Sequence, residues 1–358
     1  MKYSNSLWQI AIKKFKQSKT GMVSFGYILL CGFVAVFCYI LAPDNSNSAN
    51  QMHLEIHSKP PGFSTQLLEI PSLEKDKQHW FSIFLQGKKN TSTEIPIQSY
   101  TILKDELEVI NLSDGLPKKF SLQLFNNQPE HYIKHKTFWL GTDKYGRDLL
   151  SRLLIGARIS FFIGFIAVFI SLLVGIPIGA IAGYFGGKTD AFIMWLINIT
   201  WSIPTLLLVI AITLALGKGF WQVFIAVGLT MWVEVARVVR GQVITTKQQQ
   251  YVEAAKALGF SDLRIIFKHI LPNILAPIIV ISAANFAAAI LIESGLSFLG
   301  IGAQPPTPSW GAMIKNHYNY IILGKPYLAL IPGMAIMSLV MAFMLLGNTL
   351  RDTLDVKS

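Results

Sequence analysis

Long apolar runs constrain this chain more than any other feature of its sequence. A helix rises 1.5 Å per residue, so about 20 apolar residues cross the roughly 30 Å of hydrocarbon in a bilayer. Runs of about this length occur at residues 22–42, 159–184, 190–215, 219–239, 274–297 and 327–349. Only 14% of the residues are charged, whereas soluble domains carry about 25%. We therefore predict an all-α polytopic membrane protein with six transmembrane helices.

An even number of spans places both termini on one side, and the basic residues indicate which side that is. The tails and short loops on the side of the termini contain Lys2, Lys13, Lys14, Lys16, Lys19, Lys188, Arg237, Arg240, Lys247, Lys256, Arg264, Lys268, Arg351 and Lys357. The short loops on the other side contain Lys218, Lys315 and Lys325. Because Lys and Arg are enriched in cytoplasmic loops, we expect both termini in the cytoplasm and a multi-pass protein of the cytoplasmic (inner) membrane. A net charge of +11 could suit either nucleic acid or an anionic membrane surface. Because the basic residues follow the predicted spans, we expect the lipid bilayer as partner and no nucleic acid.

The first apolar run is predicted to be an uncleaved anchor. It extends from Met22 to Ala42, which exceeds the apolar core of a secretory signal, and no clear cleavage site follows. The preceding stretch Leu7–Ile12 favours a short amphipathic helix in the membrane interface. Cys31 and Cys38 lie too far apart along a helix for a disulfide, and without further donors nearby they predict no metal site.

Residues 44–140 form a long insertion on the extracytoplasmic side of the predicted topology. Its acidic and basic residues nearly cancel, and polar and apolar residues alternate over 95–100 and 120–125. Such alternation predicts strands, and Ser113-Asp114-Gly115 predicts a turn between them. We expect a small extracytoplasmic β-rich domain here.

Glycines recur at every fourth position over 175, 179, 183 and 187. On a helix this spacing forms a smooth stripe that lets a neighbouring helix approach closely. The last glycine belongs to Gly186-Gly187-Lys188-Thr189, which ends like a phosphate-binding loop. That pattern requires a glycine where Ala182 stands, and a strand where an apolar helix is predicted. We therefore predict a cytoplasmic turn, with no nucleotide site and no cofactor in this chain.

A basic segment follows the fourth run and could not lie in the bilayer, where each charge costs about 2.5–3.5 kcal/mol at the centre. Its sequence predicts two short helices joined at Gly259, a residue type that commonly follows a helix end. Ser261 suits the N-cap of the second helix and Pro272 its end. The apolar side of that helix consists of Ile265, Ile266 and Ile270.

Within this segment stand Glu253-Ala254-Ala255, Gly259 and Ile270-Leu271-Pro272. The pattern and its spacing resemble the EAA loop of the permease subunits of ABC importers. The resemblance implies that residues 240–273, hereafter the coupling loop, form coupling helices that dock on an ATP-binding subunit. It also implies a non-catalytic membrane subunit. Its partners would be a second homologous permease in a heterodimer, two ATP-binding subunits and an external substrate-binding protein.

Further segments resemble the dipeptide/oligopeptide type of these permeases, namely Gly141–Arg152, Leu296–Gly300, Gln304–Gly311 and Leu350–Asp352. The implied cargo is dipeptides or oligopeptides. Permeases for nickel and for glutathione belong to the same type and stay open as alternatives. The insertion is longer than in common members, so the docking of the binding protein is not carried over. On this interpretation residues 1–43 are the tail and first span, 44–140 the insertion, and 141–358 a five-helix core.

A secondary transporter would be the main alternative, and it needs ionisable groups along a membrane path. Glu234 and Glu293 are the candidates. Glu234 lies one turn before Arg237, which favours an interfacial ion pair. Glu293 either lines a possible translocation path or makes a structural hydrogen bond. Two isolated acids do not form a proton relay. A membrane-anchored sensor is disfavoured because five further spans and the coupling loop follow the first span.

Overall fold

The structure is a computed structural model that describes residues 7–71, 78–89, 92–125, 128–217 and 219–354. Lys2, Lys218 and Lys357, which enter the charge comparison above, lie outside these residues. The chain forms two compact units. One comprises the chain up to Gly32, Ser160–Gln304 and the chain from Ala335, and the other comprises Phe33–Ile159 and Pro305–Met334.

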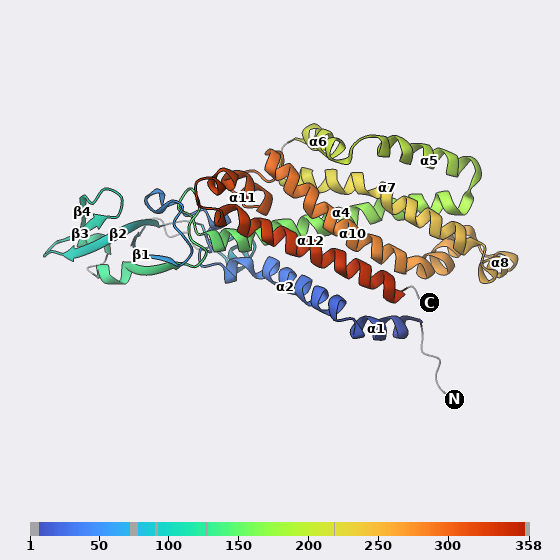
Figure 1. The fold of residues 1–358 in the computed structure, drawn as a ribbon, viewed down its shortest axis with the longest axis horizontal. Coiled ribbons are helices and arrows are strands. Elements are labelled where there is room, and N and C mark those ends of the chain that lie inside the picture. The colour runs from blue at the N-terminus through green and yellow to red at the C-terminus, as the bar shows by residue number, and fades with distance from the viewer. Residues whose placement is uncertain (1–6, 72–77, 90–91, 126–127, 218, 355–358) are drawn as a thin grey trace, which may run out of the picture. The chain divides into compact units, whose positions relative to one another are not determined.

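Most of the chain is helical, as the apolar runs predict. The helices are α1 (Leu7–Gln17), α2 (Lys19–Leu41), α3 (Trp80–Gln86), α4 (Leu149–Phe185), α5 (Gly187–Ser202), α6 (Thr205–Leu216), α7 (Phe220–Lys247), α8 (Gln250–Ala257), α9 (Asp262–Ile265), α10 (Leu275–Leu299), α11 (Trp310–His317) and α12 (Tyr327–Leu354) (Figure 1). Among the described residues, 5 helices are long and apolar enough to cross a membrane: α2, α4, α7, the continuous stretch from α9 through α10, and α12.

The predicted third span, 190–215, is not a single helix. It consists of α5 and α6, which meet at an angle of 92°. The break lies at Ile203 and Pro204, because proline has no N–H to donate and disfavours a helical conformation in the residue before it. Ile203 accordingly has extended angles, φ −94° and ψ 127°. The prediction of a single transmembrane helix over 190–215 is therefore wrong, although the bent pair can still count as one span.

The bent pair nevertheless follows α7 along its length, as Figure 1 shows. Near the start of α5, Asp190 pairs with Arg240, at 2.5 Å between Oδ1 and Nε. Further along, Ile197 packs in one cluster with Val233 of α7. On α6, Val209 shares a core cluster with several α7 side chains, Val223, Ala226, Val227 and Met231. From α5 to α6, the partners on α7 lie at successively earlier residues. The bent pair therefore runs antiparallel to α7 and can be counted as one bent span.

The glycine stripe brings α4 against α7, which confirms the packing prediction for its first three members. A Cβ at Gly175 would lie 2.7 Å from the carbonyl oxygen of Trp232, and one at Gly183 would lie 2.7 Å from that of Arg240. A Cβ at Gly179 would collide with the carbonyl oxygen of Ala236. The two backbones are therefore in direct contact. Gly187 lies beyond α4, with φ +54°, and begins α5.

The insertion contains an antiparallel sheet of five strands in the order β4-β3-β2-β1-β5. The strands are β1 (Phe63–Ile70), β2 (Thr93–Ile102), β3 (Glu106–Asn111), β4 (Pro117–Ser121) and β5 (Ile133–Phe138). Its core consists of Leu68, Ile97, Leu107, Val109 and Phe125. The alternation at 95–100 lies within β2, as predicted. The one at 120–125 does not form a strand throughout: a 3₁₀ turn at Leu122–Phe125 follows β4, and it places Phe125 in the core while Leu124 stays exposed.

We expect Gly179→Val to lower the melting temperature of the protein, since overpacking a close contact costs about 1–3 kcal/mol. Gly26→Val is the matched control. It introduces the same β-branched residue into α2, at a position where a Cβ would meet nothing within 4 Å. Thermal unfolding followed by size-exclusion chromatography measures both variants. Equal losses at the two positions would contradict a backbone contact at Gly179.

Candidate functional site

The first half of the coupling loop ends in a capping motif built on Gly259. Helix α8 has its C-cap at Leu258, and Gly259 follows with φ +77°. The N–H of Gly259 donates to the carbonyl of Lys256 at 3.0 Å, and the N–H of Phe260 donates to that of Ala255 at 3.2 Å. This pair of hydrogen bonds is the Schellman motif, which requires a left-handed residue after the C-cap. The sequence prediction of a helix end at Gly259 is confirmed.

The second half differs from the prediction. Ser261 stands at the N-cap of α9, although its side chain makes no capping hydrogen bond. Pro272 does not end the helix: the backbone continues through a π turn (Ile266–Ile270) and a 3₁₀ turn (Leu271–Ile274) into α10. A π turn changes the hydrogen-bond register ahead of the proline, which lets the chain pass a residue that lacks an N–H. The prediction that Pro272 terminates the helix is wrong.

One face of the coupling loop is buried and the other is exposed. Val252, Ala255, Ile265, Ile266 and Ile270 are buried in one cluster with α4 and α7 side chains such as Tyr184 and Val239. Glu253, Ala254, Gly259 and Pro272 are exposed, and Leu271 is half-buried. Three large apolar side chains share the exposed face: Leu258 (73% exposed), Leu263 (67%) and Phe267 (62%). A packed loop that exposes several large apolar side chains indicates a surface for another protein.

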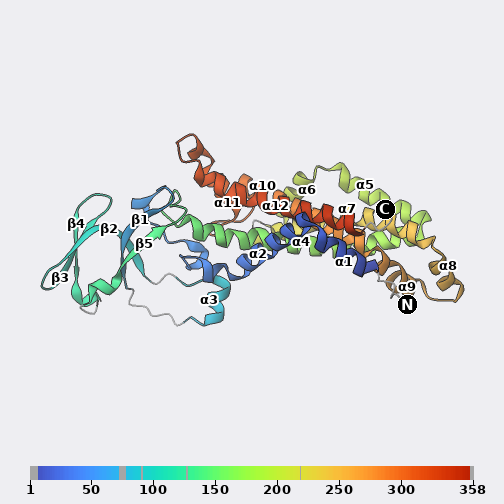
Figure 2. The ribbon, with the colours of Figure 1, turned by 60° about the horizontal axis from the view of Figure 1, so that its bottom comes forward.

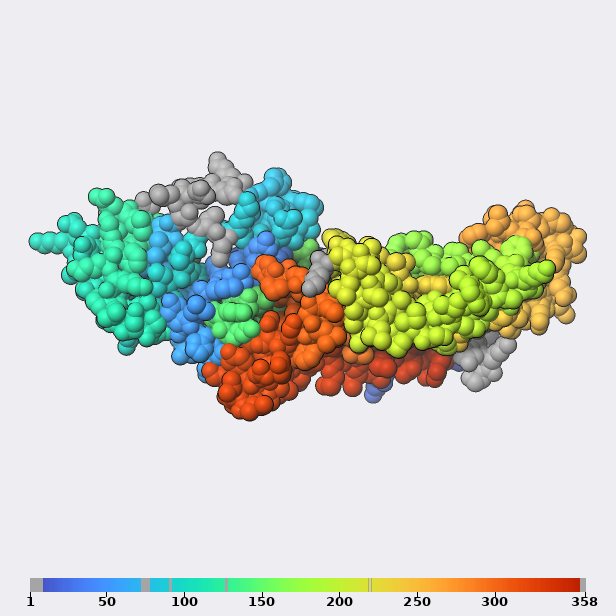
Figure 3. Space-filling view, turned by 90° about the horizontal axis from the view of Figure 1, so that it is seen from above, coloured from blue at the N-terminus to red at the C-terminus, as the bar shows by residue number. Residues whose placement is uncertain are grey.

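Tyr184 at the end of α4 ties the coupling loop to the spans. Its hydroxyl donates to Oδ1 of Asp262 at 2.6 Å, and its carbonyl accepts a hydrogen bond from Nζ of Lys247. Beside these residues lies a hollow of about 470 Å³ whose lining includes Glu253 and Lys256. Figure 3 shows the atoms of the loop, in light orange, at the surface of one end of the helices. A displacement of the loop would therefore reach α4 and α7 directly.

The two acidic candidates for a membrane path occupy different settings. Glu293 is fully buried, and Oγ of Ser297 donates to its Oε1 at 2.6 Å. Glu234 is exposed and borders a hollow of about 210 Å³ beside the bend between α5 and α6. Its expected ion pair with Arg237 is not found among the described residues. The Arg237 guanidinium instead lies 3.5 Å from the ring centre of Trp201.

The segment Gly141–Arg152 is a buried structural turn. Asp143 is inaccessible to solvent, and its Oδ2 accepts from Nε of Arg147 at 2.7 Å. Oδ1 of Asp143 accepts the backbone N–H groups of Tyr145 and Arg147 at 2.8 and 3.0 Å. At Gly146, with φ +72°, a Cβ would collide with the backbone of His53. The turn thus fastens the insertion to the start of α4.

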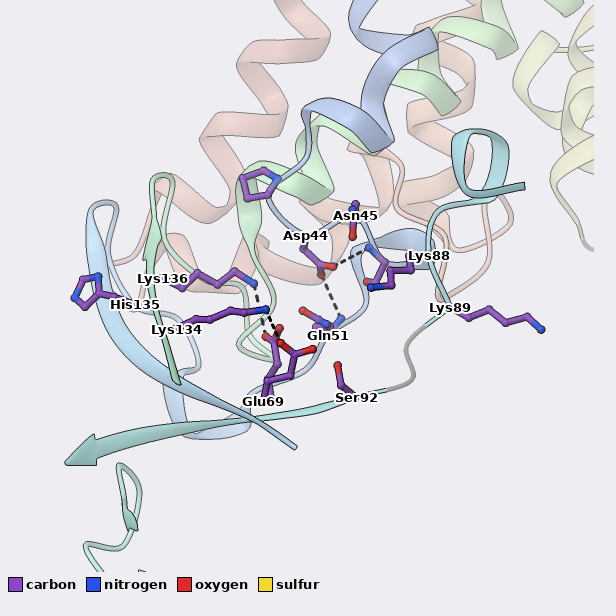
Figure 4. A pocket seen from close by; sticks show the side chains of 13 residues that line it. Asp44, Asn45, Gln51, Glu69, Lys88, Lys89, Ser92, Lys134, His135 and Lys136 are labelled. Atoms are coloured by element: carbon purple, nitrogen blue, oxygen red, sulfur yellow. Dashed lines mark hydrogen bonds and ion pairs between the residues drawn. The ribbon is translucent and has the colours of Figure 1, made fainter. Parts of the chain in front are cut away.

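A polar hollow of about 320 Å³ lies between the sheet and residues 43–51 (Figure 4). Two ion pairs line it: Lys134 pairs with Glu69 at 2.5 Å, and Lys136 with Glu94 at 3.7 Å. Glu94 also contacts His53, whose Nε2 lies 3.1 Å from Oε2 of the glutamate. Burial, reinforced by Lys136, lowers the pKa of His53 to about 4, and burial raises the pKa of Glu94. His53 is therefore neutral at pH 7, and the cluster holds the sheet in place.

Gly259→Val should strain the left-handed residue by about 1–2 kcal/mol and loosen the end of α8. Gly259→Asn is the matched control, because asparagine tolerates this conformation. Hydrogen exchange measures the effect: we expect faster exchange at the N–H groups of residues 258–260 in the valine variant alone. Unchanged protection in that variant would contradict the capping role.

Comparison with known proteins places the chain in a family. Residues 175–356 match the family described as "Binding-protein-dependent transport system inner membrane component". Residues 6–61 match "N-terminal TM domain of oligopeptide transport permease C". The two matches cover both sides of the insertion and agree with the resemblance seen in the coupling loop.

Similar curated proteins carry related names. The chain is 38% identical over 281 residues to the dipeptide transport system permease protein DppC of Alkalihalophilus pseudofirmus, covering 78% of this chain and 90% of that protein. It is 40% identical over 219 residues to the glutathione transport system permease protein GsiD of Pectobacterium atrosepticum, covering 61% and 72%. It is 40% identical over 222 residues to the oligopeptide transport system permease protein OppC of Bacillus subtilis, covering 62% and 72%. The chain belongs to the family of binding-protein-dependent transport system inner membrane components, the permease subunits of ABC importers.

Proposed function

We propose that this permease moves peptides, as dipeptides or oligopeptides, across the cytoplasmic membrane. The observation that carries the proposal is the similarity to a dipeptide permease over 90% of that protein's length. Similarity to an oligopeptide permease and to glutathione permeases, whose named cargo is itself a tripeptide, supports the same class of substrate. Glutathione remains the second candidate cargo.

The coupling loop would receive the ATP-binding subunits. The residues proposed for this role are Glu253, Ala254, Ala255, Gly259, Ile270, Leu271 and Pro272, and the exposed face of the loop adds Leu258, Leu263 and Phe267. ATP binding outside this chain would move the loop, and the buried cluster with Tyr184 would carry that movement to α4 and α7. Alternating access then follows from the unequal stabilisation of two states by ATP and cargo.

A second homologous permease, in a heterodimer, would complete the path for cargo. Phe165, Phe169 and Leu173 form a stripe of exposed side chains at helical spacing on α4, which supports a helix partner or lipid there. Glu293 stays a prediction for the path, and its burial against Ser297 favours a structural hydrogen bond. The exposed Glu234 beside the α5–α6 bend is the better placed acid.

Both termini would lie in the cytoplasm and the insertion, residues 44–140, outside. In Figure 1 the start of α1, the C-terminal end of α12 and α8 lie at the same end of the helical unit. The tight approach of Gly21 to Thr349 supports this arrangement of α2 and α12. The external insertion would then be either a docking site for the binding protein or a tolerated surface addition.

Protease added to sealed, right-side-out vesicles should cut within the insertion and leave the coupling loop intact. Inverted vesicles should give the reverse result, and they serve as the control for protease access. Cleavage products are mapped by mass spectrometry around Lys104 and Lys256. Cleavage near Lys256 in the right-side-out vesicles would overturn the topology.

Glu253→Lys should lower peptide uptake by about tenfold or more, because reversing one charge of an interfacial pair costs several kcal/mol. Asp352→Lys is the matched control, since it reverses an exposed acid on α12 outside the coupling loop. Uptake and co-purification of the ATP-binding subunits are measured in reconstituted vesicles. Equal uptake by the two variants would exclude Glu253 from the docking surface.

A further inference from the structure

Helix α3 of the insertion exposes an unusual set of side chains. Its sequence is WFSIFLQ, and none of its residues is buried. Trp80 is 71% exposed, Phe81 53% and Leu85 40%. A contiguous group of exposed aromatic and aliphatic residues without any charge is rare on a water-facing domain and marks a surface that something apolar covers.

The inner side of α3 packs on the last turns of the membrane-spanning helix α2. The rings of Phe84 and Phe37 are 5.8 Å apart, and those of Phe37 and Phe33 are 4.6 Å apart. On α2, Phe33 and Ile40 are themselves exposed, as expected for side chains that face lipid. Figure 2 shows α3 near the C-terminal end of α2, so the exposed apolar side chains of α2 continue onto α3.

Polar contacts fasten α3 and the residues after it near the ends of two apolar helices, α2 and α4. Nη1 of Arg158 donates to the carbonyl of Leu85 at 2.7 Å, and Arg158 directly precedes the apolar run of α4. The N–H of Lys88 donates to the carbonyl of Asn45 at 2.8 Å, four residues beyond the end of α2. The position of α3 is thus fixed both by α4 and by the segment that follows α2.

We propose that α3 lies in the membrane interface and anchors the insertion to the lipid surface. Trp80, Phe81 and Leu85 would enter the boundary between headgroups and acyl chains, where aromatic side chains concentrate. Lys88 and Lys89, both exposed directly after the helix, suit the phosphate groups of that layer. The proposal goes beyond peptide transport and requires only that α2 and α4 span the bilayer; the proposed topology assigns α3 to the outer leaflet.

The depth of a nitroxide label tests this proposal in the assembled importer, reconstituted in liposomes of phosphatidylethanolamine and phosphatidylglycerol. Phe81→Cys is labelled in a chain whose Cys31 and Cys38 are replaced by alanine. Leu85→Cys is a second, independent site on α3. Leu116→Cys is the matched control, because Leu116 is an exposed apolar residue (60%) in the turn between β3 and β4.

Collision rates with oxygen, which partitions into lipid, and with a water-soluble nickel chelate give the readout. We expect a higher ratio of oxygen to chelate collisions at 81 and 85 than at 116. Frequent chelate collisions at 81 and 85, equal to those at 116, would place α3 in water and overturn the proposal. Low collision rates with both reagents would show that a protein subunit covers α3, which would also overturn it.

Discussion

The backbone contact between α4 and α7 is the constraint on which the helical unit depends. Lipid gives no hydrophobic drive for helices to associate, so close packing has to supply the attraction. Gly175, Gly179 and Gly183 allow the α7 backbone to approach where any side chain would collide. The bent pair α5–α6 then lies along α7, with Asp190 bonded to Arg240. One stripe of small residues thus aligns three successive segments.

The contact between α4 and α7 also determines how the coupling loop is attached to the spans. Tyr184 lies near the end of α4, two residues after Ala182. It is hydrogen-bonded to Lys247 of α7 through its carbonyl and to Asp262 of α9 through its hydroxyl. If the loop were attached to one flexible span only, its displacement would bend that span and would not move the neighbouring one. Since the loop is fastened to two spans in backbone contact, a force on its exposed face acts on the pair as a unit. Such a connection would suit the proposed docking of an ATP-binding subunit on the loop.

Local sequence signals predicted most of the fold and the helix end in the first half of the coupling loop. Hydropathy identified the spans, and Gly259 identified the capping motif, because both depend on residues within one helical turn or one run. The continuation past Pro272 was missed, since it depends on Ile266 and Ile270 being held in the core. The bend at Pro204 could have been predicted, because a proline inside an apolar run indicates a break in the helix. The length of the run was instead interpreted as one continuous span. The absence, among the described residues, of an ion pair between Arg237 and Glu234 could not be predicted from the sequence, because Arg237 instead stacks on Trp201 of a different helix.

Exposed apolar side chains occur on both the coupling loop and α3, yet their surroundings favour different partners. Leu258 and Leu263 stand among Glu253, Lys256 and Arg264, and a charged rim around an apolar centre is how protein interfaces achieve specificity. Helix α3 has no charge within its length, and its aromatic residues continue the exposed apolar surface of α2. The nearest basic side chains, Lys88 and Lys89, follow the helix and do not stand among its apolar residues. The distribution of charge around each group, rather than its apolar character, therefore separates a protein-binding surface from a lipid-binding one.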